Sequence, residues 1–305
     1  MFLPLWAKLN QKPIERPIGG TFQWKDLSFP TRVGLAGGVD KSGKSLKSWQ
    51  ALGAGFLEVG TVTPKPQKPN PGTIMKRSLK HWALWNKMGF PSPGMDVVRR
   101  ELEKFSHQKK VPLFVNIGKN RDTPNENAFD DYSECFEALA PFADGIVVNV
   151  SSPNTKNLRE LQKGDSLGPL VESLNDFKNS KNLETPILLK LSPDLSTVEL
   201  EHGVSVSRDF VQGYILTNTT RSRIPGCGFP EEGGMSGAPL GAKSLDALKK
   251  LVSCLGPDSG HLIVSVGGVS SQSDVESRFA VGADLVQVYS SLVFHGPNFF
   301  QNLSS

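Results

Sequence analysis

The chain has little cysteine and no long apolar run. The first absence argues against a zinc or disulfide-rich protein, and the second against a membrane-spanning one. Its three cysteines, Cys135, Cys227 and Cys254, lie far apart in the 305-residue sequence. This spacing fits neither a zinc site nor a disulfide framework, so we expect no metal and a reducing cytoplasm. No stretch approaches the roughly 20 apolar residues that cross a bilayer, and no export signal begins the chain.

Charge of one sign is not concentrated anywhere. The net charge of +4 and the pI near 8.9 come from interspersed Lys and Arg. This mildly basic balance suits anionic ligands, and a nucleic-acid partner is not expected. With 38% hydrophobic and 21% charged residues, the chain is an ordinary globular protein, large enough for one barrel or two modest domains.

Eight short apolar segments, most of them followed by a helix-like pattern, organise the chain. This repetition predicts a parallel sheet with helices outside, and eight units favour a closed (β/α)8 TIM barrel over an open doubly wound sheet. The predicted strands are 33–36, 56–60, 113–117, 145–150, 187–191, 214–217, 262–266 and 285–289.

Three other segments complete the predicted organisation. The connection 61–111 is Pro-rich, with a helix expected from Met95, and the connection 218–243 has the Gly-rich composition of a lid. Residues 1–21 form a short extension before a barrel of 22–305. The apolar start 1–9 suits either a membrane surface or a strap packed against the barrel bottom.

A polar segment, Asn149-Val150-Ser151-Ser152-Pro153-Asn154-Thr155, follows the fourth predicted strand. Carboxamides donate and accept hydrogen bonds at once, so two of them beside Ser152 suit a flat, polar ring held in one orientation. A serine next to such a ring could move a proton. Taken alone, the segment equally fits a polar turn that caps the next helix.

The carboxyl ends of nearly all eight predicted strands are polar or glycine, and in a barrel these ends face one pocket. After the last two strands, such residues commonly bind a phosphate. The ammonium of Lys190 would meet a bound anion, an electron-rich ring or a partner carboxylate such as Asp194. The strand-end residues are Ala36, Gly37, Gly38 and Lys41; Gly60 and Thr61; Asn116; Asn149, Ser152 and Asn154; Lys190; Thr217, Asn218 and Thr219; Gly267 and Gly268; Tyr289 and Ser290.

Several motifs together resemble one family, and they occur in its order from about Phe22 to the C-terminus. They are Gly34-Leu35-Ala36-Gly37-Gly38-Val39-Asp40-Lys41, Gly60-Thr61-Val62-Thr63-Pro64, Asn86-Lys87-Met88-Gly89-Phe90, Asn116-Ile117-Gly118-Lys119-Asn120, the segment 149–155, Thr217-Asn218-Thr219-Thr220, Gly233-Gly234-Met235-Ser236-Gly237, and Gly267-Gly268. The chain resembles the dihydroorotate dehydrogenases, specifically their class 2 branch.

The resemblance implies a flavin mononucleotide (FMN) enzyme that oxidises dihydroorotate to orotate in pyrimidine synthesis and passes the electrons to a quinone. Ser152 would be the catalytic base, where class 1 relatives have Cys. Thr155 and Phe90 would shape its proton exit, and Lys190 would stabilise the reduced flavin anion.

The resemblance also assigns binding roles. FMN contacts would come from Gly37, Gly38, Lys41, Thr61, Asn116, Asn149, Lys190, Thr217, Gly237, Gly268, Tyr289 and Ser290. Substrate contacts would come from Lys41, Asn86, Met88, Gly89, Phe90, Asn149, Asn154, Asn218 and Thr219.

The chain departs from the family pattern where the electron acceptor is concerned. Class 2 members carry an N-terminal helix pair that forms a quinone tunnel on the membrane, but only about twenty residues precede Thr21 here. Ile74 stands where the family usually has an Arg near the quinone, with Lys76 and Arg77 following. We expect a quinone acceptor and a peripheral position on the cytoplasmic side of the cell membrane, or a soluble cytoplasmic protein if the short extension does not bind.

Three other interpretations stay open. A soluble acceptor, fumarate or NAD, would keep the substrate and change the second half-reaction. A dihydropyrimidine or dihydrouridine reductase should have Cys where this chain has Ser152. A catalytically silent flavin-binding barrel would be expected to have lost Ser152, Lys190 or a substrate Asn, and all of these are present.

Overall fold

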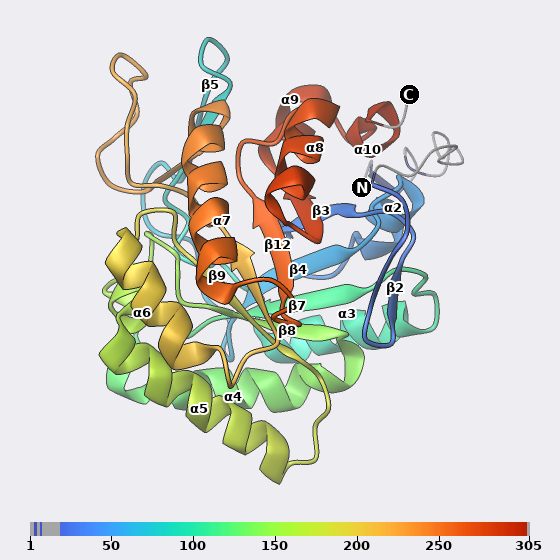
Figure 1. The fold of residues 1–305 in the computed structure, drawn as a ribbon, viewed down its shortest axis with the longest axis vertical. Helices are drawn as coiled ribbons and strands as arrows, with labels where there is room; N and C mark the ends of the chain where they lie inside the picture. Colours follow the sequence, from blue (N-terminus) through green and yellow to red (C-terminus); the bar gives the residue numbers. More distant parts are fainter. Residues whose placement is uncertain (1–2, 5–6, 8–18, 304–305) are drawn as a thin grey trace.

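The computed structural model describes residues 3–4, 7 and 19–303 (Figure 1). Eight parallel strands close into a barrel in the order β10-β12-β13-β3-β4-β7-β8-β9, which confirms the predicted (β/α)8 fold. The barrel strands are β3 (Val33–Asp40), β4 (Leu57–Val62), β7 (Leu113–Ile117), β8 (Gly145–Asn149), β9 (Ile187–Leu191), β10 (Gly213–Leu216), β12 (Leu262–Val266) and β13 (Leu285–Val288).

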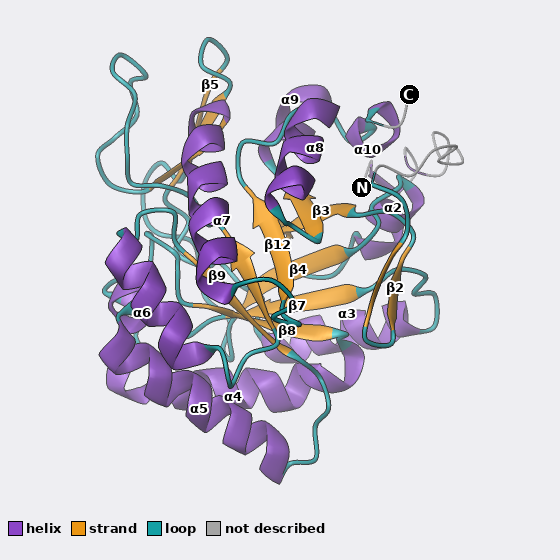
Figure 2. Cartoon of the chain, in the orientation of Figure 1, coloured by secondary structure: helices purple, strands orange, loops and turns teal. Residues whose placement is uncertain are grey.

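Helices surround these strands (Figure 2). The outward apolar side chains of the strands and the inner faces of the helices form one large core. Two helices begin at capping boxes, Ser196 with Glu199 and Ser271 with Asp274, which satisfy amides of their first turns. The helices are α2 (Leu46–Ala51), α3 (Met95–Ser106), α4 (Ala128–Leu139), α5 (Gly164–Ser180), α6 (Thr197–Ser207), α7 (Gly241–Leu255), α8 (Gln272–Val281), α9 (Ser290–His295) and α10 (Phe299–Asn302), with short 3-10 turns η1 (Asn125–Asn127), η2 (Ala140–Phe142), η3 (Leu158–Gln162) and η4 (Ala238–Leu240).

A hairpin that the sequence analysis missed closes the amino-terminal end of the barrel. It consists of β1 (Phe22–Trp24) and β2 (Leu27–Phe29), paired antiparallel. Phe29 is fully buried in the interior cluster, with its ring centroid 5.8 Å from that of Phe56 and 6.3 Å from that of Phe114. The barrel is therefore a packed core at this end, and a cavity can form only near the other.

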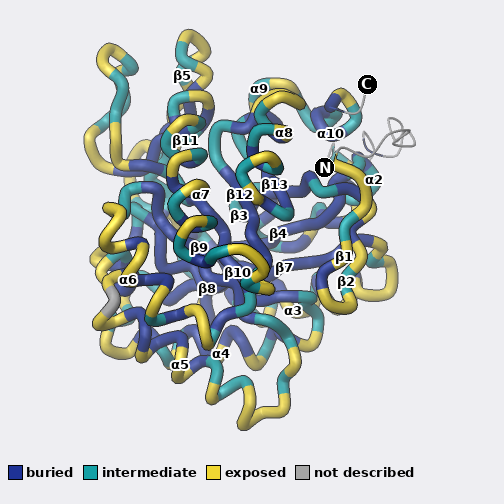
Figure 3. Tube along the Cα trace, viewed as in Figure 1, coloured by how far each residue is buried: buried dark blue, intermediate teal, exposed yellow. Residues whose placement is uncertain are grey.

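The two long connections meet in a three-stranded antiparallel sheet, which was also not predicted. Its order is β11 (Gly234–Gly237), β6 (Ala83–Asn86) and β5 (Met75–Ser78). The Gly-rich connection 218–243 contains β11, which is hydrogen-bonded along β6, and α7 begins within it at Gly241, while its role as a lid stays a prediction. The tip of the β5–β6 hairpin projects into solvent beyond the buried barrel (Figure 3).

Replacing Phe29 with alanine should destabilise the whole barrel. The substitution would leave a cavity among Phe22, Phe56 and Phe114, and we expect a loss of about 3–5 kcal/mol in the free energy of unfolding. Chemical denaturation followed by far-UV circular dichroism measures it. The Phe22→Ala control, at a partly exposed position, should cost clearly less, and equal losses in both variants would contradict the packing argument.

Candidate active site

A cavity of about 480 Å³ opens at the carboxyl end of the barrel, and every barrel strand or the residue directly after it contributes to its wall. Its size is in the range of small-molecule and cofactor sites. Every residue given a catalytic, cofactor or substrate role, except Thr155, lines this cavity, and of the strand-end residues only Gly60 does not. The convergence expected from the strand ends is therefore real, although the role of each side chain stays a prediction.

The loop after β8 is held by the side chain of Asn149. Its Oδ1 accepts hydrogen bonds from the amide and the hydroxyl of Ser151, at 3.2 and 2.9 Å. Its Nδ2 donates to Thr61 Oγ1 at 3.0 Å and to Asn116 Oδ1 at 3.1 Å. Ser152 Oγ, at the cavity wall, accepts from the amide of Asn154 at 3.2 Å. These contacts fix Ser152 relative to three strands.

Two polar oxygens near Ser152 lack a hydrogen-bond partner among the described residues. They are Asn154 Oδ1, at the cavity wall, and Thr155 Oγ1, which is buried behind it. Asn154 Nδ2 donates to Asn86 Oδ1 at 2.7 Å, so the amide has a defined orientation with its oxygen left to accept. A buried unpaired acceptor at a cavity wall is suited to an N–H donor of a ligand.

Lys190 has a carboxylate partner, but the suggested Asp194 is wrong. Its Nζ lies 2.7 Å from Oε1 of Glu58, a fully buried residue of β4. Lys190 points into the barrel from β9, whereas Asp194 lies beyond that strand and binds other cations. The signal for Glu58 was a single charge within an apolar strand, Phe56 to Gly60, but its partners are distant in sequence.

Asp194 instead ties together three loops that border the cavity. It accepts from Arg159 Nη1 at 2.7 Å, from Lys243 Nζ at 2.6 Å and from the amide of Arg221 at 2.7 Å. Arg159 continues to the carbonyl of Ser151 at 2.9 Å and to that of Thr219 at 2.7 Å. Arg159 therefore anchors both the Ser152 loop and the loop after β10.

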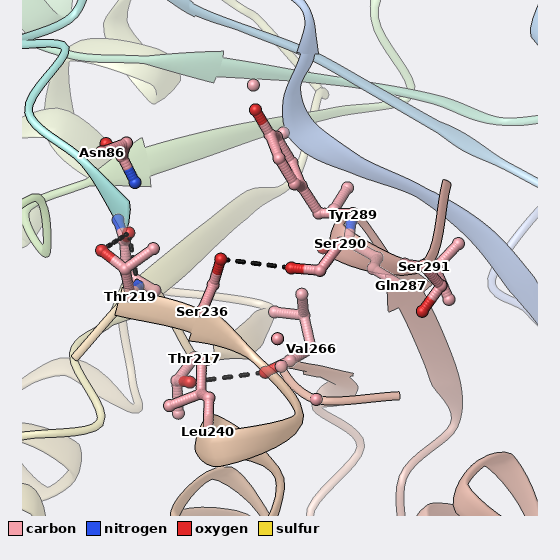
Figure 4. A pocket seen from close by; sticks show the side chains of 18 of the residues that line it. Asn86, Thr217, Thr219, Ser236, Leu240, Val266, Gln287, Tyr289, Ser290 and Ser291 are labelled. Atoms are coloured by element: carbon pink, nitrogen blue, oxygen red, sulfur yellow. Dashed lines mark hydrogen bonds between the residues drawn. The ribbon is translucent and has the colours of Figure 1, made fainter. Parts of the chain in front are cut away.

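The opposite wall of the cavity is built from backbone that tolerates no side chain. A Cβ on Gly268, whose φ is +70°, would lie 2.3 Å from Gly241 Cα. Ser236 and Ser290 face each other here with their hydroxyls 3.1 Å apart (Figure 4). Glycine backbone and hydroxyls in this arrangement suit a phosphate group.

The sequence analysis missed an aromatic group at the cavity mouth. The ring of Trp82 lies 5.1 Å from that of Phe294 and stacks on His295 at 5.2 Å. All three line the cavity, as do Ser236, Leu240, Gln287 and Ser291. Among the described residues, the exposed large hydrophobic side chains are Met75, Leu79, Trp82, Val198 and Val293, and all but Val198 belong to β5, the β5–β6 turn or α9.

Comparison with known proteins identifies the family. The model of the family described as dihydroorotate dehydrogenase matches residues 21–305. The chain belongs to the dihydroorotate dehydrogenase family. It is 44% identical over 279 residues to the dihydroorotate dehydrogenase (quinone) of Stenotrophomonas maltophilia, covering 89% of this chain and 79% of that protein. It is 43% identical over 283 residues to the protein of the same name from Chromobacterium violaceum, covering 89% and 80%.

A solved dihydroorotate dehydrogenase has the same fold. The crystal structure of the Eimeria tenella protein in complex with ferulenol superposes with a TM-score of 0.91 at 33% identity, covering 99% of this chain and 87% of that one. The predicted family and barrel fold are thereby confirmed. Dihydroorotate dehydrogenases are flavin-dependent oxidoreductases, and the glycine wall, the hydroxyls and the buried Lys190 of this cavity fit such a cofactor.

No helix of residues 3–4, 7 and 19–303 is both long and apolar enough to cross a membrane. The same residues contain no group of three or more His, Cys, Asp or Glu side chains that could hold a metal ion. The expectation of a membrane contact or strap at 1–9 falls largely outside the described residues.

The Asp194 network should make the protein sensitive to acid. Burial alone raises the pKa of this carboxyl, but hydrogen bonds from Lys243, Thr220, the Arg221 amide and Arg159 outweigh it and lower the pKa to about 2. Because the folded-state pKa lies below the unfolded value, the stabilisation is present above about pH 4 and is lost as the pH falls toward 2.

An Asp194→Asn variant should therefore lose about 1–3 kcal/mol of unfolding free energy near pH 7. Its difference from the wild type should shrink below about pH 4. Urea titrations at several pH values measure this difference. A gap between the two proteins that stays constant down to pH 2.5 would contradict the assigned network.

Proposed function

We propose that this protein oxidises dihydroorotate to orotate in pyrimidine synthesis, with FMN as its flavin and a quinone as the final electron acceptor. The proposal is carried by one observation, the placement of Ser152 at the wall of the same cavity as Lys190 and several carboxamides. Membership of the dihydroorotate dehydrogenase family and the relatives named dihydroorotate dehydrogenase (quinone) support it.

The substrate is held by side chains that match its ring and its carboxylate. Asn86 and Asn154 are coupled by a 2.7 Å hydrogen bond, and the free Oδ1 of Asn154 accepts from a ring N–H. Asn218 Nδ2 donates to Ser151 Oγ at 3.0 Å, which aligns this amide beside the serine loop. Lys41 supplies a cation for the carboxylate; burial lowers its pKa, while Asp40 opposes that effect. Asn149, Thr219, Met88, Gly89 and Phe90 complete the substrate wall.

Ser152 takes the proton from one ring carbon while a hydride leaves the neighbouring carbon, so that a carbon–carbon double bond forms. A serine hydroxyl is a weak base at neutral pH and requires a route for its proton. The Oγ1 of Thr155 is buried without a hydrogen-bond partner among the described residues, and Phe90 lines the cavity. We assign to these two residues the proton exit and its shielding from bulk water.

FMN, when bound, would supply the hydride acceptor and carry the electrons from the substrate to the quinone. The amides around Gly268 and the hydroxyl of Ser290 would hold its phosphate, where Gly237 and Gly241 approach without side chains. Lys190 and Asn116 line the cavity at the strand ends, where they would bind the polar edge of the ring. Gly37, Gly38, Thr61, Asn149, Thr217 and Tyr289 would make further contacts.

The side chains at the mouth of the cavity favour a membrane quinone as the electron acceptor. Trp82 and Phe294 offer aromatic surface there, and Leu79 is 66% exposed at the adjoining turn. Lys76 and Arg77 on exposed β5 add positive charge, which suits anionic lipid. We propose a peripheral position on the cytoplasmic side of the membrane with this mouth toward the lipid.

Removing the Ser152 hydroxyl should slow proton abstraction while leaving ligand binding nearly unchanged. A Ser152→Ala variant should slow anaerobic flavin reduction by dihydroorotate about 10²–10⁴-fold, with the affinity for orotate changed only a few-fold. A Ser152→Cys variant should recover activity as the pH rises through about 8.5, because the thiolate is the basic form. Stopped-flow absorbance measures both rates. Unimpaired reduction in the alanine variant would refute Ser152 as the base.

The acceptor can be tested separately from the substrate. After reduction by dihydroorotate, a short-chain quinone should reoxidise the flavin at least about tenfold faster than fumarate or NAD, because the aromatic mouth favours a planar apolar acceptor. If only fumarate or NAD reoxidised the flavin, dihydroorotate would remain the substrate but the quinone would be ruled out as the acceptor.

A vesicle assay tests the orientation on the membrane. With the quinone dissolved in vesicles that contain anionic lipid, Leu79→Ser should slow reoxidation. Val198→Ser is the matched control, since Val198 is 73% exposed and does not line the cavity, and its helix α6 lies apart from β5 and α9 (Figure 1). Equal effects of the two substitutions would contradict a lipid contact at the mouth.

A further inference from the structure

Glu58 is a fully buried carboxylate directly beneath the cavity, and it does not itself line the cavity. Its Oε1 accepts from Lys190 Nζ at 2.7 Å and from Asn116 Nδ2 at 2.6 Å. Its Oε2 accepts from Gln287 Nε2 at 2.6 Å. All three donors line the cavity and come from different strands, so one carboxylate orients three groups that face the cofactor site.

The position of Gly37 shows how close this carboxylate is to the cavity wall. A Cβ at Gly37 would lie 2.1 Å from Glu58 Oε1 and 3.3 Å from Lys190 Nζ. Only a residue without a side chain leaves room for both ends of the ion pair. The negative and the positive charge therefore lie side by side under the same stretch of cavity wall.

Stability alone is a weak reason for such a pair. A buried ion pair contributes little compared with apolar side chains of similar volume, because both charges must leave water. The rest of the barrel interior is filled in the apolar way, by residues such as Phe114, Leu188 and Leu285. The ion pair of Glu58 and Lys190 lies in the layer that borders the cavity. Its electrostatic field in the cavity explains its presence better than stability does.

We propose that Glu58 is a positioning residue and counter-charge that acts through Lys190 to set the redox potential of the bound flavin. The inference rests on the proposed function only in placing the flavin ring beside Lys190. An ammonium next to the ring favours the reduced, more negative form, and a carboxylate 2.7 Å from that ammonium offsets part of its field. Glu58 thus lowers the reduction potential of the bound flavin below the value that Lys190 alone would give. The reduced flavin therefore stays able to give electrons to the acceptor.

The test is an anaerobic dye-equilibrated reductive titration of the flavin-loaded protein, which requires no dihydroorotate. A Glu58→Gln variant keeps the size and the oxygen acceptor but removes the charge. Its equilibrium should shift toward the reduced flavin about tenfold, equivalent to about 30 mV for a two-electron couple. An unchanged or lower potential would overturn the proposal.

Two further variants separate this role from a purely structural one. Glu58→Asp keeps the charge but withdraws it from Lys190, so its potential should fall between those of the wild type and Glu58→Gln. This variant also gives the sign of the effect if Glu58→Gln fails to fold. In a Lys190→Met background, Glu58→Gln should change the ratio of reduced to oxidised flavin less than threefold, because the ammonium whose field Glu58 offsets is then absent. A full tenfold shift in that background would show that Glu58 does not act through Lys190.

Asp144→Asn is the matched control. Asp144 forms a 2.7 Å ion pair with Lys109 just before β8 begins, at the opposite end of the barrel. This substitution should lower the thermal midpoint of unfolding and leave the flavin potential unchanged. If Asp144→Asn shifted the flavin potential as much as Glu58→Gln, the effect would come from a general loss of stability and not from the charge of Glu58. If the potentials follow the prediction but dihydroorotate does not reduce the flavin, this inference stands and the proposed substrate fails.

Discussion

Closure of eight parallel strands into a barrel is the constraint on which the rest of this molecule depends. Inward side chains recur at every second residue, so a step of two residues along a strand crosses from core to cavity. On β7 this step leads from Phe114 to Asn116, and on β9 from Leu188 to Lys190. A slip of one residue would turn Lys190 toward the helices, so the apolar layers determine where the polar layer lies.

Burial of the polar layer costs less free energy because most of its members are hydrogen-bonded to one another. Asn149 bonds to both Thr61 and Asn116, and Asn116 donates in turn to Glu58. A network of this kind holds each group in one orientation before any ligand arrives, which lowers the cost of arranging them during the reaction. The site is rigid where the barrel holds it, and Arg159 extends this order to the loops above.

The sequence predicts the barrel well because its signal is local. The strands Leu113–Ile117, Ile187–Leu191 and Leu262–Val266 were predicted with these bounds, since each is an apolar run between turn residues. The sheet formed by β5, β6 and β11 was missed because its strands are short and the third lies far along the chain. Local patterns carry no information about such pairing.

The site, too, has features with a local sequence signal and features that depend on long-range contacts. Most of the wall residues were predicted because they stand at a recognisable strand end or within a family motif, whereas the aromatic residues at the mouth carry neither signal. The charges beneath them were not, because Glu58 and Lys190 are separated by 132 positions, and only barrel closure brings them together. Asp194 was the nearer acid in sequence but faces Arg159 and Lys243 instead.

The most direct measurement is the absorbance of the flavin-loaded protein when dihydroorotate is added without oxygen. We expect loss of the oxidised flavin band with one orotate formed per flavin. A bound flavin whose absorbance does not change with excess dihydroorotate would contradict it, whichever acceptor is present.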